Sequence, residues 1–518
     1  MVEGTIQKAE RVAFNTIILY VKLLVKLGIS LFSTRLVLNA LGATDFGIFN
    51  LIAGVIAMLS FLNGAMTAST QRYLSFYQGL NDFEIQKKIF TNSWILHIAL
   101  GAFIVILLWA ISSFLFDDFL NIPTDRIPAA KAIYYFMSIS VFFTIVSVPF
   151  TATLNAHENM LWIANVNIIE VFLNLAIALS LTRFIQAERL TMFGVLTAVV
   201  SLIVFLFYAV FCLKKYKECN IKKYKADKHL IKELSGFAGW NLFGALCGIG
   251  RTQGLAIILN VFFGAIVNAA YGIAVQVAQI QSFSATMLQA INPQIMKSEG
   301  MGDRQRMLRL SMMASKCGFF LFAIVTIPII FEMSAILKIW LKNVPEYTVV
   351  FCSLFLIVIL INQITIGLQS AIQAVGKIKT YQTVVGGIQL LNLPIAYLML
   401  RQGFPPYSVL QCAIIIEMFA CVFRLFFLKK IAGLSIREYF NRVILKEILP
   451  LFTIVFTCWF ITSQVSIDFR FFITGIISSI IFAISVYFLG LCKDEKELVN
   501  ILIKKLLNKK DEYKLYRS

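Results

Sequence analysis

Residues 190–213 read LTMFGVLTAVVSLIVFLFYAVFCL, a run without a single charged side chain. A helix needs roughly 20 apolar residues to cross the ~30 Å hydrocarbon layer of a bilayer, so this run can span it. Similar runs recur along the whole chain and predict fourteen transmembrane helices, at 12–39, 46–68, 91–115, 131–153, 160–183, 190–213, 236–260, 264–291, 307–334, 347–372, 380–400, 406–429, 446–465 and 470–491. The runs lack the ten-residue alternation of a lipid-spanning β-barrel. We therefore expect an all-α, polytopic membrane protein.

The composition agrees with this fold class. Of 518 residues, 59% are hydrophobic and 14% are charged, whereas about a quarter of the residues of a soluble domain are charged. The apolar run after the polar residues 1–11 is too long for a signal peptide and lacks a small-residue cleavage pattern, so we expect the first helix to be retained.

Basic residues are distributed unequally between the two sets of loops. With the N-terminus in the cytoplasm, 33 of the 46 Lys and Arg residues fall on the cytoplasmic side and eight on the other. The positive-inside rule therefore predicts that both termini are cytoplasmic. The net charge of +19 mostly reflects this asymmetry, and no basic face is interleaved with aromatic residues, so no nucleic-acid partner is expected.

The two halves of the chain resemble one another. LGATDFGIFNLIAGV (41–55) is echoed by FGAIVNAAYGIAVQV (263–277), and further pairs of segments also lie 215 to 225 positions apart. Two six-helix lobes of parallel topology are therefore predicted. The expected organisation is an N-lobe of helices 1–6 (1–213), a cytoplasmic basic linker (214–235), a C-lobe of helices 7–12 (236–430), helices 13–14 (431–492) and a cytoplasmic amphipathic tail (493–518).

Cations inside the predicted spans are the first candidates for a binding site, because a charge at the centre of a bilayer costs at least ~2.5 kcal/mol. Lys22 and Lys26 share a helical stripe with Asn15, Ser30 and Ser33. A stripe facing a water-filled cavity would account for them, and the alternative is a salt bridge to an acid on another helix.

Two arginines extend this candidate set. Arg35 lies near the outer end of the first helix, where it either faces the cavity or anchors at the interface. Arg251 lies about mid-span in a glycine-rich stretch, and a guanidinium suits bidentate contact with phosphate. Lys316, two turns into its helix, is close enough to the inner surface for its ammonium to snorkel.

Two acids within the spans are candidates for ion pairing or for coupling. Glu170 could pair with a lysine of the first helix or take up a proton. Glu417 shares a helix face with Arg424, but seven positions separate them, which is too far for an i,i+4 pair. Asn362 belongs to a polar stripe that either joins helices by hydrogen bonds or contacts sugar hydroxyls.

Catalysis has almost no support in the sequence. The chain has three histidines and no GxSxG, HExxH or Walker motif, so neither a nucleophile with its base nor an ATP site is predicted. The nine cysteines are scattered singly, which predicts no metal site or disulfide framework. We expect a protein that is not an enzyme and needs no cofactor.

Two motifs carry a resemblance to a known family. The first is a turn with the pattern LG-x-x-x-[YF]G-[IL]-x-x-L at 41–51, and the second is the run WN…N-x-FFG…N-x-A…NPQI at 240–295. Together with the two six-helix lobes, they resemble the polysaccharide-transport, O-antigen (Wzx-type) flippases of the multidrug/oligosaccharidyl-lipid/polysaccharide exporter superfamily.

The resemblance implies a function. Such a flippase would move polyprenyl-pyrophosphate-linked oligosaccharide, carried on undecaprenyl pyrophosphate, across the bacterial inner membrane by alternating access. Its partners would be membrane lipid and a glycan polymerase complex. Lys22, Lys26, Arg35 and Arg251 would then bind the substrate's pyrophosphate. Two alternatives stay open: a multidrug/cation antiporter of the same superfamily, and a non-transporting scaffold in a glycan assembly complex. Antiporters of cations typically carry an acid on helix 1 or helix 7, where this chain has none.

Overall fold

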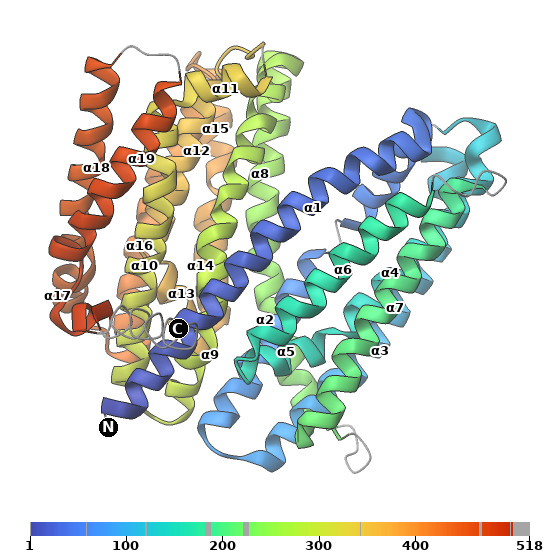
Figure 1. Ribbon diagram of the computed structural model, residues 1–518, viewed down its shortest axis with the longest axis horizontal. Coiled ribbons are helices and arrows are strands. Elements are labelled where there is room, and N and C mark those ends of the chain that lie inside the picture. Colours follow the sequence, from blue (N-terminus) through green and yellow to red (C-terminus); the bar gives the residue numbers. More distant parts are fainter. Residues whose placement is uncertain are drawn as a thin grey trace, which may run out of the picture. The chain divides into compact units, whose positions relative to one another are not determined.

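The computed structural model describes residues 2–57, 60–119, 122–181, 188–220, 227–341, 343–465, 469–497 and 499–500. Throughout these ranges the ordered elements are helices and no strand occurs, which confirms the all-α fold class (Figure 1). Most of the predicted C-terminal tail, and residues 221–226 of the predicted linker, lie outside the described residues.

The chain divides into two compact units. The N-terminal unit comprises Asn15–Leu242 and Gly300–Gly302. The C-terminal unit comprises Met1–Phe14, Phe243–Glu299 and Asp303–Ser518. Two long helices contribute to both units, α1 (Val2–Ala57) and α8 (Lys228–Val277). The lobe boundaries proposed from the sequence repeat remain a prediction.

The N-terminal unit is a helical bundle. Besides parts of α1 and α8, its helices are α2 (Ser60–Gly79), α3 (Phe83–Ala110), α4 (Ile127–Val146), α5 (Val148–Ala156), α6 (Met160–Ser180) and α7 (Arg189–Lys215), with the short helical segments η1 (Phe114–Phe119), η2 (Thr124–Arg126) and η4 (Lys217–Cys219).

The C-terminal unit contains the remaining elements. They are η6 (Ala278–Gln281), α9 (Ser282–Gly300), α10 (Arg304–Phe331), α11 (Met333–Leu341), α12 (Thr348–Gln363), α13 (Ile366–Val375), α14 (Ile378–Leu390), α15 (Asn392–Arg401), α16 (Ser408–Ala432), α17 (Ile436–Tyr439), η7 (Phe440–Ile444), α18 (Leu445–Gln464), α19 (Arg470–Ser485) and η8 (Val486–Gly490).

Eleven helices in the described ranges are long and apolar enough to cross a membrane, or twelve when the bent pair α12 and α13 is counted as one span. The predicted count of fourteen is therefore not confirmed. The predicted spans 46–68 and 264–291 account for the difference. The first includes residues 58 and 59, which are not described, and the second is interrupted by η6, a turn of 3-10 helix.

Two glycines break the long helices at equivalent places. Gly42 in α1 has φ 79° and Gly264 in α8 has φ 75°, a left-handed backbone that costs glycine little. The two positions are 222 residues apart, within the spacing of the sequence repeat. Near Gly42, the guanidinium of Arg189 donates to the carbonyl oxygen of Ala40 at 2.8 Å, and that of Arg126 donates to Asp45 at 2.8 Å. Side-chain hydrogen bonds therefore hold the backbone before Gly42 and the side chain of Asp45 after it.

The two units also share helix-start signals. Asp82 caps α3 by accepting from the backbone N–H of Ile85, and Asp303 caps α10 by accepting from the N–H of Arg306, at 3.0 Å in both cases. A residue with positive φ precedes each cap, Asn81 before Asp82 and Gly302 before Asp303. Each start is thus encoded locally by a turn residue followed by an aspartate.

Close helix packing in the N-terminal unit depends on a small residue. α4 and α7 lie against each other, and a Cβ on Gly194 of α7 would come within 3.0 Å of the Cα of Ile133 in α4. Small residues permit such an approach in a bilayer, where dispersion between well-packed surfaces must replace hydrophobic driving force. The fully buried Ile133 and Leu190 belong to the apolar core of this unit.

In the C-terminal unit, α18 and α19 pack on each other and on α10 (Figure 1). On α10, the Lys316 side chain is only 1% exposed and pairs with Glu495, while its ammonium also donates to the carbonyl oxygen of Arg442 at 3.2 Å. The expectation that Lys316 snorkels to the surface is wrong, because acceptors that follow α19 and precede α18 reach it inside the protein.

A bend of 46° separates α12 from α13. Side chains on three other elements form hydrogen bonds with backbone groups at the bend. The carbonyl oxygen of Ile364 accepts from the hydroxyl of Tyr439, and that of Ile361 accepts from the thiol of Cys421 at 3.4 Å. The N–H of Gly367 donates to the hydroxyl of Ser315 at 3.0 Å. A broken helix inside a membrane protein requires such partners.

Substitution of Gly367 by Ala should destabilise the C-terminal unit. A Cβ there would lie 2.0 Å from the carbonyl oxygen of Ser311 and 2.9 Å from the hydroxyl of Ser315, so α13 would have to move away from α10. Overpacking of this kind costs about 1–3 kcal/mol. Thermal unfolding in detergent measures the change. In the control Gly387→Ala the new Cβ has no neighbour within 4 Å; equal stability of the two variants would contradict the close approach.

Candidate functional site

Two lysines on α1 form the charged part of the candidate site in the N-terminal unit. Lys22 is half-buried and Lys26 is exposed, and their spacing of four places them on one face of the helix. Asn15, another member of the predicted stripe, is not available to bind a substrate. Asn15 is 3% exposed, and its amide donates to the carbonyl oxygen of Glu158 at 3.0 Å. The N-terminal end of the stripe therefore connects α1 to the turn that contains Glu158.

Glu170, on α6, is the acid of this group. Its carboxylate interacts electrostatically with both Lys22 and Lys26. The described part of the chain nevertheless shows no ion pair within 4 Å between Glu170 and either lysine. One turn earlier, the amide of Asn167 donates to the hydroxyl of Tyr208 at 2.7 Å, which fixes α6 against α7. Lys22, Lys26 and Glu170 therefore form a group that is coupled electrostatically.

Arg35 stands apart from this group. It lies about three and a half turns beyond Lys22 on α1, and its side chain is exposed. The candidate substrate role of Arg35 is left as a prediction from the sequence.

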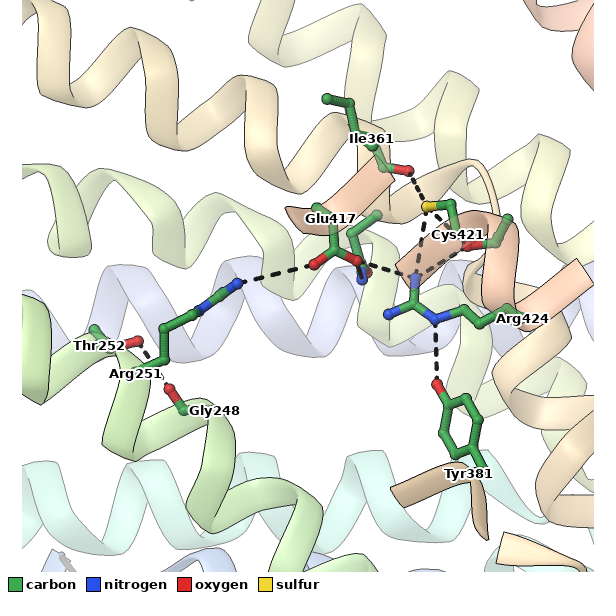
Figure 2. Close-up of polar contacts among 10 residues, drawn as sticks. Gly248, Arg251, Thr252, Ile361, Tyr381, Glu417, Cys421 and Arg424 are labelled. Atoms are coloured by element: carbon green, nitrogen blue, oxygen red, sulfur yellow. Dashed lines mark hydrogen bonds and ion pairs between the residues drawn. The ribbon is translucent and has the colours of Figure 1, made fainter. Parts of the chain in front are cut away.

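The C-terminal unit holds a second charged group, centred on Glu417 of α16 (Figure 2). One oxygen of its carboxylate accepts from the amide of Asn362 at 2.7 Å and pairs with the guanidinium of Arg424 at 3.0 Å. The Glu417 side chain is 2% exposed and that of Arg424 is 1% exposed. Glu417 and Arg424 therefore form a buried ion pair, although seven positions separate them.

Further contacts lock Arg424 in place. Its Nε donates to the hydroxyl of Tyr381 at 3.2 Å, and its terminal nitrogen donates to the hydroxyl of Thr365 at 3.0 Å. Thr365 lies at the bend between α12 and α13, next to the C-terminal end of α12. The partial negative charge of a helix C-terminus stabilises a cation placed there.

Arg251, on α8, approaches the same carboxylate from the other side (Figure 2). Its guanidinium lies 3.9 Å from the second oxygen of Glu417, too far for a hydrogen bond. The Arg251 side chain is 16% exposed. The structure therefore brings two of the predicted site residues, Arg251 and Glu417, into one group and adds Arg424 to them.

Several members of the second group were not expected from the sequence. Tyr381 and Thr365 carry no charge, and their positions in apolar helices gave no signal of a role. Asn362 was noted for its polar stripe, and the structure assigns it a bond between α12 and α16. Within the described residues, no cluster of three or more His, Cys, Asp or Glu could hold a metal ion.

Residues 17–180, about a third of the chain, match the MatE family model. No curated protein matches the sequence.

Solved structures match nearly the whole described fold. A MATE transporter in the bent conformation has 13% identity and a TM-score of 0.73, covering 83% of this chain and 99% of its own. A mutant of the Vibrio cholerae MATE transporter VcmN has 14% identity and a TM-score of 0.69, covering 84% and 99%. A Pyrococcus furiosus transporter of the MOP superfamily has 13% identity and a TM-score of 0.71, covering 82% and 96%. The reverse polarity of that transporter's binding pocket is described as suggesting a different function. This chain has the MATE transporter fold.

Proposed function

We propose that the protein is a membrane transporter that works by alternating access and carries an anionic, lipid-linked substrate. One observation supports this most strongly: in each unit the transmembrane helices bring two cations to one carboxylate. The group is Lys22, Lys26 and Glu170 in the N-terminal unit and Arg251, Arg424 and Glu417 in the C-terminal unit. Each group has a surplus positive charge in a setting where an unpaired charge is costly.

The substrate class follows from this surplus. Positive potential attracts a pyrophosphate and repels an organic cation, and lysine and arginine are the side chains that bind phosphate groups. We therefore favour a polyprenyl-pyrophosphate-linked oligosaccharide, which would be moved from the cytoplasmic to the outer leaflet of a bacterial inner membrane. The asymmetry of the basic loops supports cytoplasmic placement of both termini.

A multidrug or cation antiporter is the second candidate. The MatE match over residues 17–180 and the solved MATE transporters favour it at least as well, and one of those matched is described as a multidrug resistance transporter. Glu170 and Glu417 would be the acids available to such an antiporter. The net charge of the two groups is the observation that weighs against it.

Reconstitution in proteoliposomes decides between the two. Liposomes with and without protein would be loaded with a fluorescent polyprenyl-pyrophosphate oligosaccharide, and its exposure to a membrane-impermeant quencher would be followed over time. In parallel, uptake of a fluorescent organic cation would be measured under a proton or sodium gradient. We expect accelerated flipping of the lipid and no gradient-driven movement of the cation. The reverse result would establish the second candidate.

A further inference from the structure

We propose that Glu417 is an internal counter-ion from which Arg251 separates when Arg251 takes up the anionic group of the transported molecule. The inference rests on the proposed function, because it assumes an anionic substrate. It assigns different tasks to the two arginines around Glu417: Arg424 stays with the carboxylate, and Arg251 exchanges it for the substrate.

The distances establish an order among the partners of Glu417. Asn362 donates to the carboxylate at 2.7 Å, Arg424 pairs with it at 3.0 Å, and Arg251 is 3.9 Å away. The first contact is a hydrogen bond, the second is a close ion pair, and the third is a longer ion pair. The contact with Arg251 is therefore the weakest of the three.

The two arginines also differ in what else holds them. Arg424 is 1% exposed and donates to Tyr381 and Thr365. Arg251 is 16% exposed, and its buried terminal nitrogen nearest Glu417 has no hydrogen-bond partner. A buried donor without an acceptor is unfavourable, so Arg251 gains from an anion that provides one. Figure 2 shows the Arg251 side chain extended toward Glu417.

The departure of Arg251 leaves no buried charge unpaired. Glu417 keeps Arg424 and Asn362, so its carboxylate remains neutralised and hydrogen-bonded. An anion that binds Arg251 competes only with the long contact to Glu417. Removal of the charge on Glu417 should therefore strengthen anion binding, and the gain should depend on Arg251.

Binding of farnesyl pyrophosphate, a short prenyl pyrophosphate, to the full-length protein in nanodiscs tests this. We expect Glu417→Gln to tighten binding by about fivefold or more, a typical size for coupling between two sites. Arg251→Gln should weaken binding, and Glu417→Gln should bring no gain in the Arg251→Gln background. Farnesol, which lacks the anion, should bind the wild type and Glu417→Gln equally.

Two further variants keep the test decisive. Glu417→Asp retracts the charge from Arg251 without removing it, so it should give a smaller gain, and it answers the question if Glu417→Gln does not fold. Glu447→Gln removes another buried carboxylate of the same unit and should leave binding unchanged.

The outcomes separate the inference from the proposed function. Wild-type protein that does not bind farnesyl pyrophosphate overturns both. Binding that Arg251→Gln weakens, but that Glu417→Gln and Glu417→Asp leave unchanged, overturns the inference alone. The inference is also overturned if Glu417→Gln tightens binding in the Arg251→Gln background, if Glu417→Gln tightens the binding of farnesol, or if Glu447→Gln tightens binding as well. Any of these results would show that the tighter binding does not come from release of Arg251.

Discussion

Replacement of Arg424 by Met is expected to destabilise the protein by about 3–5 kcal/mol, the usual cost of removing one partner of a buried ion pair. Arg424 is 1% exposed and joins Glu417 to the hydroxyl groups of Tyr381 and Thr365. Without Arg424, the two hydroxyl oxygens lose the hydrogen-bond donor that it supplies, and Glu417 keeps only the more distant Arg251 as a cationic partner. The loss should appear as a lower midpoint of thermal unfolding in detergent.

Lys429→Met is the matched control for this prediction. Lys429 lies on the same helix, carries the same charge and is exposed. Surface substitutions usually change the free energy of unfolding by less than about 0.5 kcal/mol. Arg424→Met as stable as Lys429→Met would show that the buried pair contributes nothing to the fold of the C-terminal unit.

The double variant Lys22→Glu, Lys26→Glu is expected to reduce flipping of the lipid-linked oligosaccharide by more than about 100-fold. Each hydrogen bond to a charged group contributes about 1.5–3 kcal/mol, and two such contacts would be replaced by repulsion. The reversed charges would also join Glu170, so three acids would face the substrate's pyrophosphate. The proteoliposome assay measures the rate.

Two related variants separate charge from folding. Lys22→Arg, Lys26→Arg keeps both charges and should retain most of the activity. The double variant Lys22→Gln, Lys26→Gln removes both positive charges without adding acids. It should therefore fold and still lose most of the lipid-flipping activity. Full activity of the doubly reversed protein would exclude these lysines from substrate binding, and faster uptake of an organic cation by it would favour the antiporter.

The sequence predicted the features that depend on local chemistry. Apolar runs of more than 20 residues specify helices wherever they occur, and the glycines at 42 and 264 mark the same break in both halves because only glycine adopts that backbone at low cost. The count of spans did not follow from the apolar runs, because interruptions such as η6 divide a continuous apolar run into shorter helices.

The charged groups were only partly predictable. Glu417 and Arg424 were placed on one helix face, but spacing alone did not show that they touch. Side chains on a helix lean toward its N-terminus, so the long Arg424 side chain reaches back over two turns to Glu417. Lys316 was misjudged for a different reason: its partner Glu495 is 179 positions away, and no local pattern reports such a contact.

The bend between α12 and α13 has a consequence for biogenesis. When residues 348–375 leave the ribosome, Tyr439, whose hydroxyl donates to the carbonyl oxygen of Ile364 at the bend, has not yet been synthesised. A nascent span in lipid cannot leave backbone groups unpaired. This segment must therefore enter the membrane as a straighter helix, or wait beside the insertion machinery, until the later helices arrive and the bend can form.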